Sequence, residues 1–562
     1  MLLLLFACLF ALPFPRRARD WAGAFGTGMA VYFALLIAAG AAALLLHVPQ
    51  LLPMLPYLAV PVALIGWFRG RRQWRTWLAA STTETRYRAL IAAAAVAVLA
   101  ACERATSLPM GWDSAFHALL AQKILLSGAW PQNWLPFTAI PLNYPPGTHI
   151  LLAEIAAGFG LPVPLAERQL QFALMVPSAL LAGSIAARAF RSAEAGWFAG
   201  LGLAFWGELG TAISFRMWGG YPTALGFLFF FALCRFALAG GVGGRGWFGA
   251  VLCWGGLGLS HHLTAVIAGL IVAAFAVQAL GSRRRAEKRV LARLFASGLA
   301  AVLCFLAAEA AMLRAAGDFH SVNAFNFSEE PLFGWRELLT FSGVLLPAGL
   351  VGLWCARRCR TPGARLLFGW LAVMAAVFVI DEYPYRLWCS RRIWGIESTV
   401  FPASRFLTAM ALPLAAYAGF AAASAVRDRR KAALVLTLLL TAGGVVRYGL
   451  ALATERQFDI AAVAARINET VPENAYLVVD LPRAGNVGWL AYLTWKPGTM
   501  TPIPASENRR IGCFGAAIFA MPDSPRAMEV RRAFVEAQGL EAWLVAERDG
   551  RIVIEPYSYQ SR

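Results

Sequence analysis

The sequence is poor in charged residues. Only 14% of its 562 residues are Asp, Glu, Lys or Arg, whereas soluble domains carry about 25%. Hydrophobic residues make up 59% of the chain, and its mean hydropathy is +0.59. So little charge excludes a protein that is soluble along its whole length. It predicts a polytopic membrane protein with one soluble region near the C-terminus.

Acidic residues are fewer than basic ones. The chain has 31 Asp and Glu against 50 Lys and Arg, a net charge of +19. Such an excess also occurs in nucleic-acid-binding proteins. Here the basic residues gather in short loops between apolar runs, where they set the orientation of membrane spans. The pattern therefore argues against nucleic acid as a partner and favours the lipid bilayer.

Several familiar signatures are missing. The sequence has no P-loop, no obvious internal repeat, and no second ligand pair that would make Cys355 and Cys359 a zinc site. Met1–Phe14 has no basic n-region or cleavage site, so we predict no signal peptide. It would reach roughly 21 Å, short of the ~30 Å hydrocarbon core, which leaves open whether it spans. The sequence requires no cofactor, and a divalent cation stays open.

The basic loops predict the topology. Arg16–Arg19 and Arg69–Arg75 are placed inside. The later basic loops then also fall inside if His149–Gly160, a run of about twelve residues, does not cross the membrane. We expect about 13 to 14 transmembrane helices in this arrangement. The later basic loops are Arg188–Arg191, Arg235–Arg245, Arg283–Arg293, Arg357–Arg365 and Arg427–Lys431.

Three regions are predicted. Residues 1–87 form N-terminal transmembrane helices, residues 88–452 form an all-α membrane domain whose first outer loop is 103–149, and residues 453–562 form a small extracytoplasmic α/β domain. Periodicity and turn signals predict the elements of the last region. They are a helix over Asp459–Thr470, a strand over Ala475–Leu481, a helix over Ser524–Glu536, and strands over Ala542–Glu547 and Arg551–Glu555 around the turn Asp549-Gly550.

The first outer loop holds an acidic residue and two histidines. Asp113 and His117 are four residues apart, so they share one face of a helix. The sequence Asn-Tyr-Pro-Pro-Gly cannot continue that helix, and His149 opens the next apolar run. A polar face at a membrane surface fits an active site. It also fits an interfacial helix that turns its polar side to water, and both interpretations stay open.

Other ionisable residues gather towards the predicted outer side, and such residues near the membrane are often functional. His261 and His262 divide the apolar stretch Trp247–Leu280. They could form a ligand site, or they could simply mark the tip of a helical hairpin. Asp381 and Glu382 fit an acidic site or an ordinary helix exit. Five arginines lie outside against the positive-inside trend, which suits anion binding, although solvated charge explains them as well. They are Arg216, Arg386, Arg391, Arg392 and Arg405.

These features together resemble the GT-C superfamily of membrane glycosyltransferases. Gly111-Trp-Asp113 follows an apolar span, and Tyr144-Pro-Pro-Gly-Thr-His149 leads into a short apolar run. The closing pattern AARINETVPENAYLVVD, followed by WLAYLT, is similar to the outer domains of many bacterial members. The apolar runs before residue 88 and the lone Asp113 depart from the usual pattern, since many members carry a paired acidic motif. Metal binding is therefore left open.

The resemblance implies a hexosyl- or pentosyltransferase of the bacterial inner membrane. Its donor would be a sugar on a polyprenyl phosphate, and its acceptor a glycan, lipid or protein reached from outside, with inversion. Asp113 would act as base, supported by His117 and His149, with Asp381 and Glu382 as the next acidic candidates. Cations would stabilise the leaving phosphate. The candidates are Arg216, Arg386, Arg391, Arg392, Arg405, His261 and His262.

Two other function classes stay open. One is a transporter or flippase of lipid-linked saccharides, which would need polar residues continuing towards the cytoplasm. The other is a non-catalytic assembly subunit that keeps the fold without the chemistry. The sequence also leaves open whether Cys389 and Cys513, both outside in this topology, form a disulfide.

The topology is testable with single cysteines in a variant without the native ones. We expect a membrane-impermeant maleimide to label Asp549→Cys in intact cells, because the C-terminal region lies outside. Ala286→Cys should react only after the cells are opened. A protected cysteine at position 549 would contradict the topology.

Overall fold

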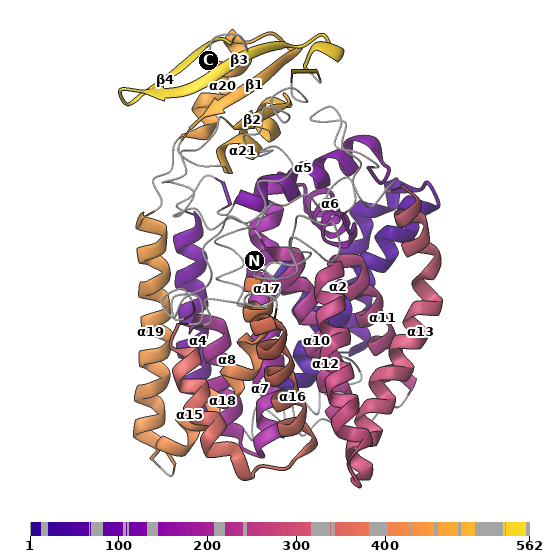
Figure 1. Ribbon diagram of the computed structural model, residues 1–562, viewed down its shortest axis with the longest axis vertical. Helices are drawn as coiled ribbons and strands as arrows, with labels where there is room; N and C mark the ends of the chain where they lie inside the picture. Colours follow the sequence, from indigo (N-terminus) through magenta and orange to yellow (C-terminus); the bar gives the residue numbers. More distant parts are fainter. Residues whose placement is uncertain are drawn as a thin grey trace.

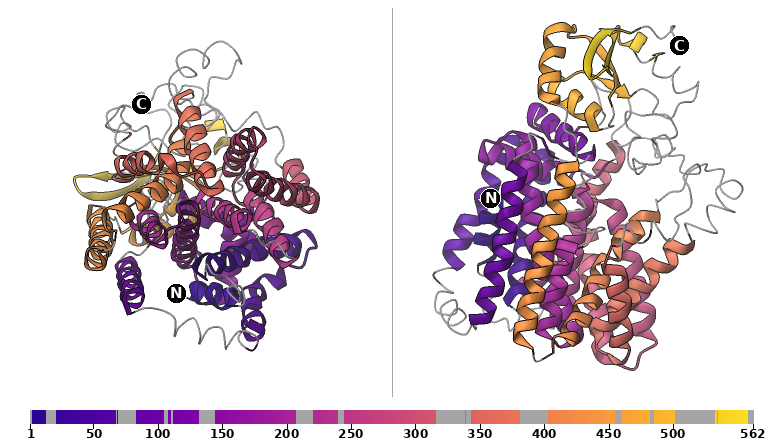
Figure 2. Two further views of the ribbon diagram at one scale, coloured as in Figure 1. Left: turned by 90° about the horizontal axis from the view of Figure 1, so that it is seen from below. Right: turned by 90° about the vertical axis from the view of Figure 1, so that its left-hand side faces the viewer.

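The computed structural model describes residues 2–12, 21–66, 68, 83–104, 108–109, 112–131, 144–206, 220–239, 244–315, 338, 343–380, 403–427, 429–454, 459–481, 485–500, 532–533 and 535–557. Long helices run roughly along the long axis of the molecule, and a small sheet lies at one end of them (Figure 1). Figure 2 shows the same arrangement from the side and along the axis.

Helices dominate the chain because its apolar runs are rich in Ala and Leu, which favour helix. The helices up to residue 239 are α1 (Leu2–Ala11), α2 (Trp21–Leu45), η1 (Pro49–Leu58), α4 (Thr83–Arg104), α5 (Trp112–Ser127), α6 (Gly147–Phe159), α7 (Val163–Phe190), α8 (Ala193–Leu201), the π-helix η2 (Gly202–Trp206) and α10 (Tyr221–Ala239).

The later elements include the sheet. They are α11 (Gly244–Ser260), α12 (His262–Leu280), α13 (Arg285–Ala315), α15 (Leu345–Cys355), η4 (Ala356–Arg358), α16 (Pro362–Ile380), α17 (Ala403–Ala409), α18 (Ala411–Ala425), α19 (Arg430–Thr454), α20 (Ile460–Thr470), β1 (Ala475–Asp480), α21 (Gly485–Thr494), β2 (Gly498–Met500), β3 (Glu541–Arg548) and β4 (Arg551–Pro556).

The predicted fold class, an all-α membrane part with a small α/β unit at its C-terminal end, is confirmed. Within the described ranges, seven helices are long and apolar enough to cross a membrane, and five apolar helices are shorter. The expected total of about 13 to 14 spans and the boundaries at residues 87 and 452 stay predictions. The predicted break at His261-His262 is confirmed, since α11 ends at Ser260 and α12 begins at His262.

The N-terminal helices are part of the bundle. α2 is largely buried and packs against α6, α7, α10 and α11. The described part of the first apolar run, α1, has 10 residues, which is about 15 Å of helix. α6 has 13 residues, so it is too short to cross the membrane, as expected from the sequence. It is enclosed by η1, α2 and α5, and this enclosure keeps His149 away from solvent.

The C-terminal unit is a four-stranded mixed sheet with the order β2-β1-β3-β4. β1 pairs in parallel with β2 and β3, and β3 pairs antiparallel with β4. Asp549 and Gly550 join β3 to β4 with φ of 51° and 72°, the positive values that tight hairpin turns favour. The predicted first helix and the three predicted strands are confirmed; the predicted helix 524–536 lies almost wholly outside the described residues.

The unit contacts the membrane part through α21 and α5. The two helices cross closely at Gly488, where a Cβ atom would lie 2.7 Å from the Ala115 Cβ. Any larger residue would push the helices apart. The glycine therefore allows α21 to lie directly on the helix that carries Ser114 and His117.

The opposite end gathers basic loops. Thr361 donates to the Ala189 carbonyl at 2.5 Å, Arg284 contacts the Arg360 carbonyl, and Arg293 donates to the Ala237 carbonyl. Four of the predicted inside loops are thereby joined. The turn between α15 and α16 and the sheet lie at opposite ends of the long axis (Figure 1). The shared end agrees with the positive-inside pattern.

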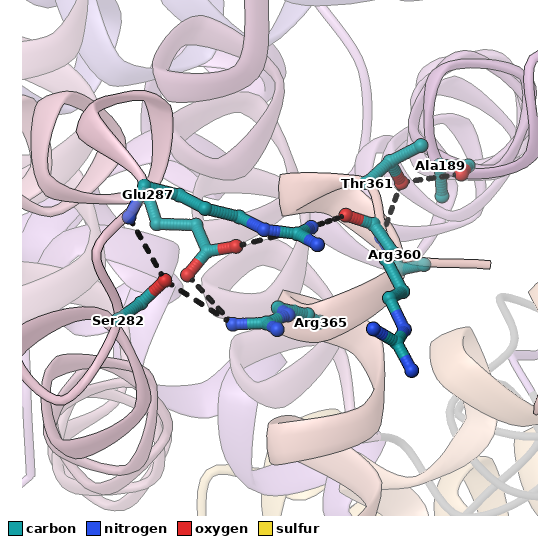
Figure 3. Close-up of polar contacts among 8 residues, drawn as sticks. Ala189, Ser282, Glu287, Arg360, Thr361 and Arg365 are labelled. Carbon is teal, nitrogen blue, oxygen red and sulfur yellow. Dashed lines mark hydrogen bonds and ion pairs between the residues drawn. The ribbon is translucent and has the colours of Figure 1, made fainter. Parts of the chain in front are cut away.

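A single buried carboxylate connects these loops. Glu287 is fully buried and accepts from Arg365 at 2.9 Å, while Arg284 lies 3.9 Å away. Ser282 contacts the same Arg365 guanidinium (Figure 3). Because both arginines are partly exposed, this carboxylate compensates charges that are only partly desolvated.

Removing this charge should weaken the basic end. We expect Glu287→Gln to lower the free energy of unfolding by about 1–3 kcal/mol, the usual value for losing a charged hydrogen bond. The exposed pair Arg532–Glu536 gives the matched control: Glu536→Gln should change stability little, because water and salt screen exposed ion pairs. Thermal midpoints in detergent measure both variants, and equal midpoints would contradict this role for Glu287.

Candidate functional site

Two histidines from separate helices meet at the end of the bundle nearest the C-terminal unit. The Nδ1 of His117 on α5 lies 3.0 Å from the Nε2 of His149 on α6. Both side chains are buried, His149 completely. The proline turn before α6 therefore brings His149 back to the face of α5 that carries His117.

Aromatic rings enclose the histidine pair. The Tyr144 ring centroid lies 5.7 Å from that of His117 and 5.5 Å from that of His149, and Trp130 lies 6.4 Å from His149. Tyr144 belongs to the rigid Tyr-Pro-Pro-Gly turn, whose prolines fix the backbone. The turn therefore sets the position of an aromatic wall as well as that of His149.

The two imidazoles share one hydrogen bond, so only one nitrogen of the contact carries a proton. Burial lowers the pKa of His149 well below its usual value, the charge of His117 lowers it further, and the Pro145 carbonyl acts in the opposite direction. The Nδ1 of His149 has no hydrogen-bond partner within the described residues. Its lowered pKa favours the neutral form of the His149 ring.

The Tyr221 hydroxyl lies beside this pair and joins three helices. Gln171 of α7 donates to it at 2.5 Å, and Ser114 of α5 lies 2.5 Å from it. Tyr221 begins α10, and its ring centroid is 6.1 Å from that of His117. This buried hydroxyl links the start of α10 to α5 and α7, so it holds the site together from three sides.

Glu167 lies on α7 in the same neighbourhood. It is fully buried, and neither carboxylate oxygen has a hydrogen-bond partner in the described part of the chain. The hydroxyls of Ser114 and Tyr221 are near enough to act on its charge without reaching hydrogen-bond geometry. A buried carboxylate without a protein partner is costly, which makes this residue a functional candidate.

His261 adjoins the cluster from another helix. Its ring centroid lies 6.3 Å from that of Tyr144. Its Nδ1 accepts from the Thr264 backbone N–H at 3.2 Å and so caps α12. The other nitrogen, Nε2, lies 3.3 Å from the Thr223 hydroxyl. Since Nδ1 is an acceptor, the neutral ring carries its proton on Nε2. His262 is the first residue of α12.

The C-terminal unit reaches the same place. Burial, and then the charge of Glu167, raise the pKa of Tyr492 on α21 to about 12. A residue of the α/β unit thus lies within electrostatic range of a carboxylate on α7. Among the side chains that the structure describes, no group of three His, Cys, Asp or Glu gathers that could hold a metal ion.

The remaining predicted site residues are not placed by side chain. Asp113 is the second residue of α5, one position before Ser114, and Arg405 lies on α17. Their side chains fall outside what the structure describes. So do the following residues, backbone included: Arg216, Asp381, Glu382, Arg386, Arg391, Arg392, Cys389 and Cys513.

Sequence reasoning missed Ser114, Glu167, Gln171 and Tyr221. Tyr221 lies in Gly-Gly-Tyr-Pro, which reads most simply as a turn. Glu167 and Gln171 are four residues apart near the start of an apolar span, hence on one helix face. This spacing could have indicated a polar helix face. A single carboxylate at the start of a span is, however, also typical of an ordinary residue at the membrane surface.

No protein-family model and no curated protein matches the chain. Solved structures do. Crystal structures of ArnT from Cupriavidus metallidurans, apo and bound to undecaprenyl phosphate, match with TM-scores of 0.55 and 0.54 at 15% and 17% identity. Each covers 84% of this chain and 98% of ArnT. The apo oligosaccharyltransferase of Archaeoglobus fulgidus matches with a TM-score of 0.50 at 13% identity, covering 82% of this chain and 69% of that one.

These proteins are glycosyltransferases of the GT-C superfamily. At such low identity the likeness establishes the fold, and the fold expected from Gly111-Trp-Asp113 and the proline turn is confirmed. The chain therefore has a GT-C fold, with a buried polar cluster where the helix bundle meets the C-terminal unit.

The lowered pKa of His149 predicts a pH dependence of stability. The folded-state pKa of His149 lies below the unfolded value of about 6.5, so the unfolded state binds more protons and stability falls as pH drops through about 6.5. We expect the difference in stability between wild type and His149→Gln, from thermal midpoints, to change by up to ~1.4 kcal/mol per pH unit below that point. Parallel pH profiles for the two proteins would contradict a lowered pKa of His149.

Proposed function

We propose that the protein is a membrane glycosyltransferase. It transfers a hexose or pentose from a polyprenyl-phosphate-linked donor to an acceptor at the outer face of a bacterial inner membrane, with inversion. The acceptor is a glycan, a lipid or a protein, and the C-terminal unit is extracytoplasmic. The observation that carries the proposal is the fold, which 84% of this chain shares with 98% of an ArnT that was solved bound to undecaprenyl phosphate.

The position of the polar cluster supports this proposal. Buried polar groups from four helices converge beside the half-buried Tyr144 at one end of an apolar bundle, beneath α21. A lipid-borne donor presents its phosphate and sugar at the headgroup level, at an end of the bundle. The basic loops occupy the other end, which the positive-inside trend assigns to the cytoplasm. The cluster then faces outward.

The reaction needs a base and a stabilised leaving group. The Asp113 carboxylate accepts the proton of the acceptor hydroxyl, and the acceptor oxygen forms a bond to the anomeric carbon. The bond from that carbon to the phosphate oxygen breaks, and the lipid phosphate leaves with the electron pair. Since the attack comes from the opposite face, one displacement inverts the centre. His117, four residues after Asp113, orients the site together with His149.

Cations stabilise the negative charge that develops on the phosphate. We assign this role to the outer arginines Arg216, Arg386, Arg391, Arg392 and Arg405. Arg suits it because its planar fork of donors matches phosphate oxygens. His261 and His262 are further candidates. His261 lies beside Tyr144, and its Nε2 proton, held near Thr223 at 3.3 Å, is a donor on the cluster side of α12.

The alternative of transport is less well supported. A transporter needs polar groups continuing towards the middle of the bilayer. The central parts of four spans contain no Asp, Glu, Lys, Arg or His, and ionisable residues stand only near their ends. These apolar stretches are 169–187, 222–234, 263–280 and 366–380.

The proposal assigns Asp113 a decisive role. Asp113→Asn keeps size and polarity but removes the basic charge, so we expect the variant to fold and bind donor yet transfer sugar at least ~100-fold more slowly. The measurement is transfer of labelled sugar from a polyprenyl-phosphate donor by purified protein. Asp549→Asn, at the tip of the β3–β4 turn where Asn is equally suited, is the matched control. Near-normal turnover by Asp113→Asn would remove Asp113 from the mechanism and direct attention to Asp381 and Glu382.

A further inference from the structure

One face of α7 presents acceptor oxygens that have no hydrogen-bond partner among the residues the structure describes. Glu167 and Gln171 are four residues apart, hence on the same face, and both side chains are at least nine-tenths buried. Both carboxylate oxygens of Glu167 and the amide oxygen of Gln171 have no hydrogen-bond partner in the described part of the chain. The Gln171 amide nitrogen is already used, since it donates to Tyr221.

Buried acceptor oxygens without donors destabilise the folded protein. A buried polar group that lacks a partner destabilises a protein by about 1–3 kcal/mol, and a charged group by more. Three unfilled oxygens on one helix face are therefore unfavourable unless donors reach them. The nearest hydroxyls, those of Ser114 and Tyr221, are bonded to each other at 2.5 Å, and this bond leaves one hydroxyl proton between them for three acceptor oxygens. A ligand can supply the remaining donors.

The face lies where a substrate would be held. Tyr221 connects it to the histidine pair, with its ring centroid 6.1 Å from that of His117. Tyr492 of α21 lies within range of the Glu167 charge, and α21 packs on α5 at Ala115, the residue after Ser114. The group held here is therefore near the atoms that react but is enclosed by protein.

We propose that Glu167 and Gln171 bind hydroxyl groups of a saccharide in the transfer reaction. This inference rests on the proposed function and adds to it the residues that recognise the sugar. A carboxylate repels phosphate, so the ligand group at this face is not the lipid phosphate. Saccharide hydroxyls supply the missing donors, and a carboxylate that accepts from them makes a charge-assisted bond, which is about twice as strong as a neutral one.

The first measurement compares affinities with and without sugar. The probes are undecaprenyl phosphate and its hexose- and pentose-bearing forms, titrated into purified protein in nanodiscs. Wild type should bind one sugar-bearing form more tightly than the bare lipid. If the bound hydroxyls belong to the donor sugar, Glu167→Gln should reduce this preference about 10-fold and Glu167→Met about 10- to 100-fold, as expected for loss of a charged hydrogen bond. Affinity for bare undecaprenyl phosphate should stay unchanged.

Stability separates a binding role from a structural one. Replacing a buried, unpaired carboxylate with an apolar side chain of similar size is neutral or stabilising when nothing is bound. We therefore expect Glu167→Met to have an unchanged or higher thermal midpoint without ligand. Gln171→Leu, which removes the other acceptor, should also weaken the preference for sugar. A lower midpoint for Glu167→Met, with an intact preference and unchanged KM values for donor and acceptor, would show a structural role and overturn the proposal.

Glu154 provides the matched control. It is also fully buried, and its two carboxylate oxygens also lack partners in the described part of the chain. Its carboxylate lies against Gly40 of α2 instead of facing Tyr221. Glu154→Gln should leave the sugar preference as in wild type. Equal losses in Glu154→Gln and Glu167→Gln would mean that burial of charge, not contact with sugar, explains the effect, and would overturn the proposal.

Steady-state kinetics decides which sugar is held. If the hydroxyls belong to the donor, the Glu167 variants raise KM for the lipid-linked sugar; if they belong to a saccharide acceptor, the preference in binding stays and KM for the acceptor rises. If wild type transfers sugar and neither quantity changes in the variants, the proposal fails while the proposed function stands. If wild type binds no undecaprenyl phosphate in any form, the proposed function fails first.

Discussion

The architecture of the site depends on one buried hydroxyl. In an apolar bundle a polar group must find a partner, because an unmade hydrogen bond costs about 1–3 kcal/mol. Tyr221 satisfies this requirement between three helices at once, since its oxygen contacts Gln171 of α7 and Ser114 of α5 while its own helix begins there. The hydroxyl thus fixes the distance between the start of α10 and the helix that carries Asp113 and His117.

The two ends of the bundle are built on opposite principles. At the basic end, Glu287 balances the arginines of neighbouring loops, and the charges there are compensated. At the other end, Glu167 is buried without a hydrogen-bond partner in the described part of the chain, and burial lowers the pKa of His149. Compensated charge suits a structural role. Buried polar groups without partners lower the stability of the folded protein, and a bound substrate can supply the missing hydrogen bonds. This contrast is the physical reason for locating function beside α21 and not among the basic loops.

Much of the fold could be predicted from the sequence. Apolar periodicity and the basic loops gave the helices, the break at His261-His262 and the short α6. Asp549-Gly550 gave the hairpin, because both residues tolerate positive φ. The meeting of His117 and His149 could be anticipated because two prolines leave the chain few ways to continue. In these cases a local rule was strong enough to decide the structure.

The rest of the site depends on long-range contacts. Tyr221 is an ordinary turn residue until α5 and α7 pack against it, and Glu167 is an ordinary interfacial carboxylate until α21 covers its end of the bundle. Neither event leaves a local pattern. The crossing at Gly488 is similar: one glycine among many in this chain proves essential only when Ala115, more than 370 residues earlier, lies 2.7 Å from where a Cβ would be.

The central claim is that the cluster around Tyr221 is where a lipid-linked sugar is bound. Photo-crosslinking tests it most directly, with an undecaprenyl-phosphate sugar that carries a diazirine on the sugar and with the modified peptides identified by mass spectrometry. The account predicts crosslinks to the first turns of α5, α7 and α10 and to α21, competed by unmodified donor. Crosslinks confined to the basic loops around Glu287, or to the outer surface of the bundle alone, would contradict it.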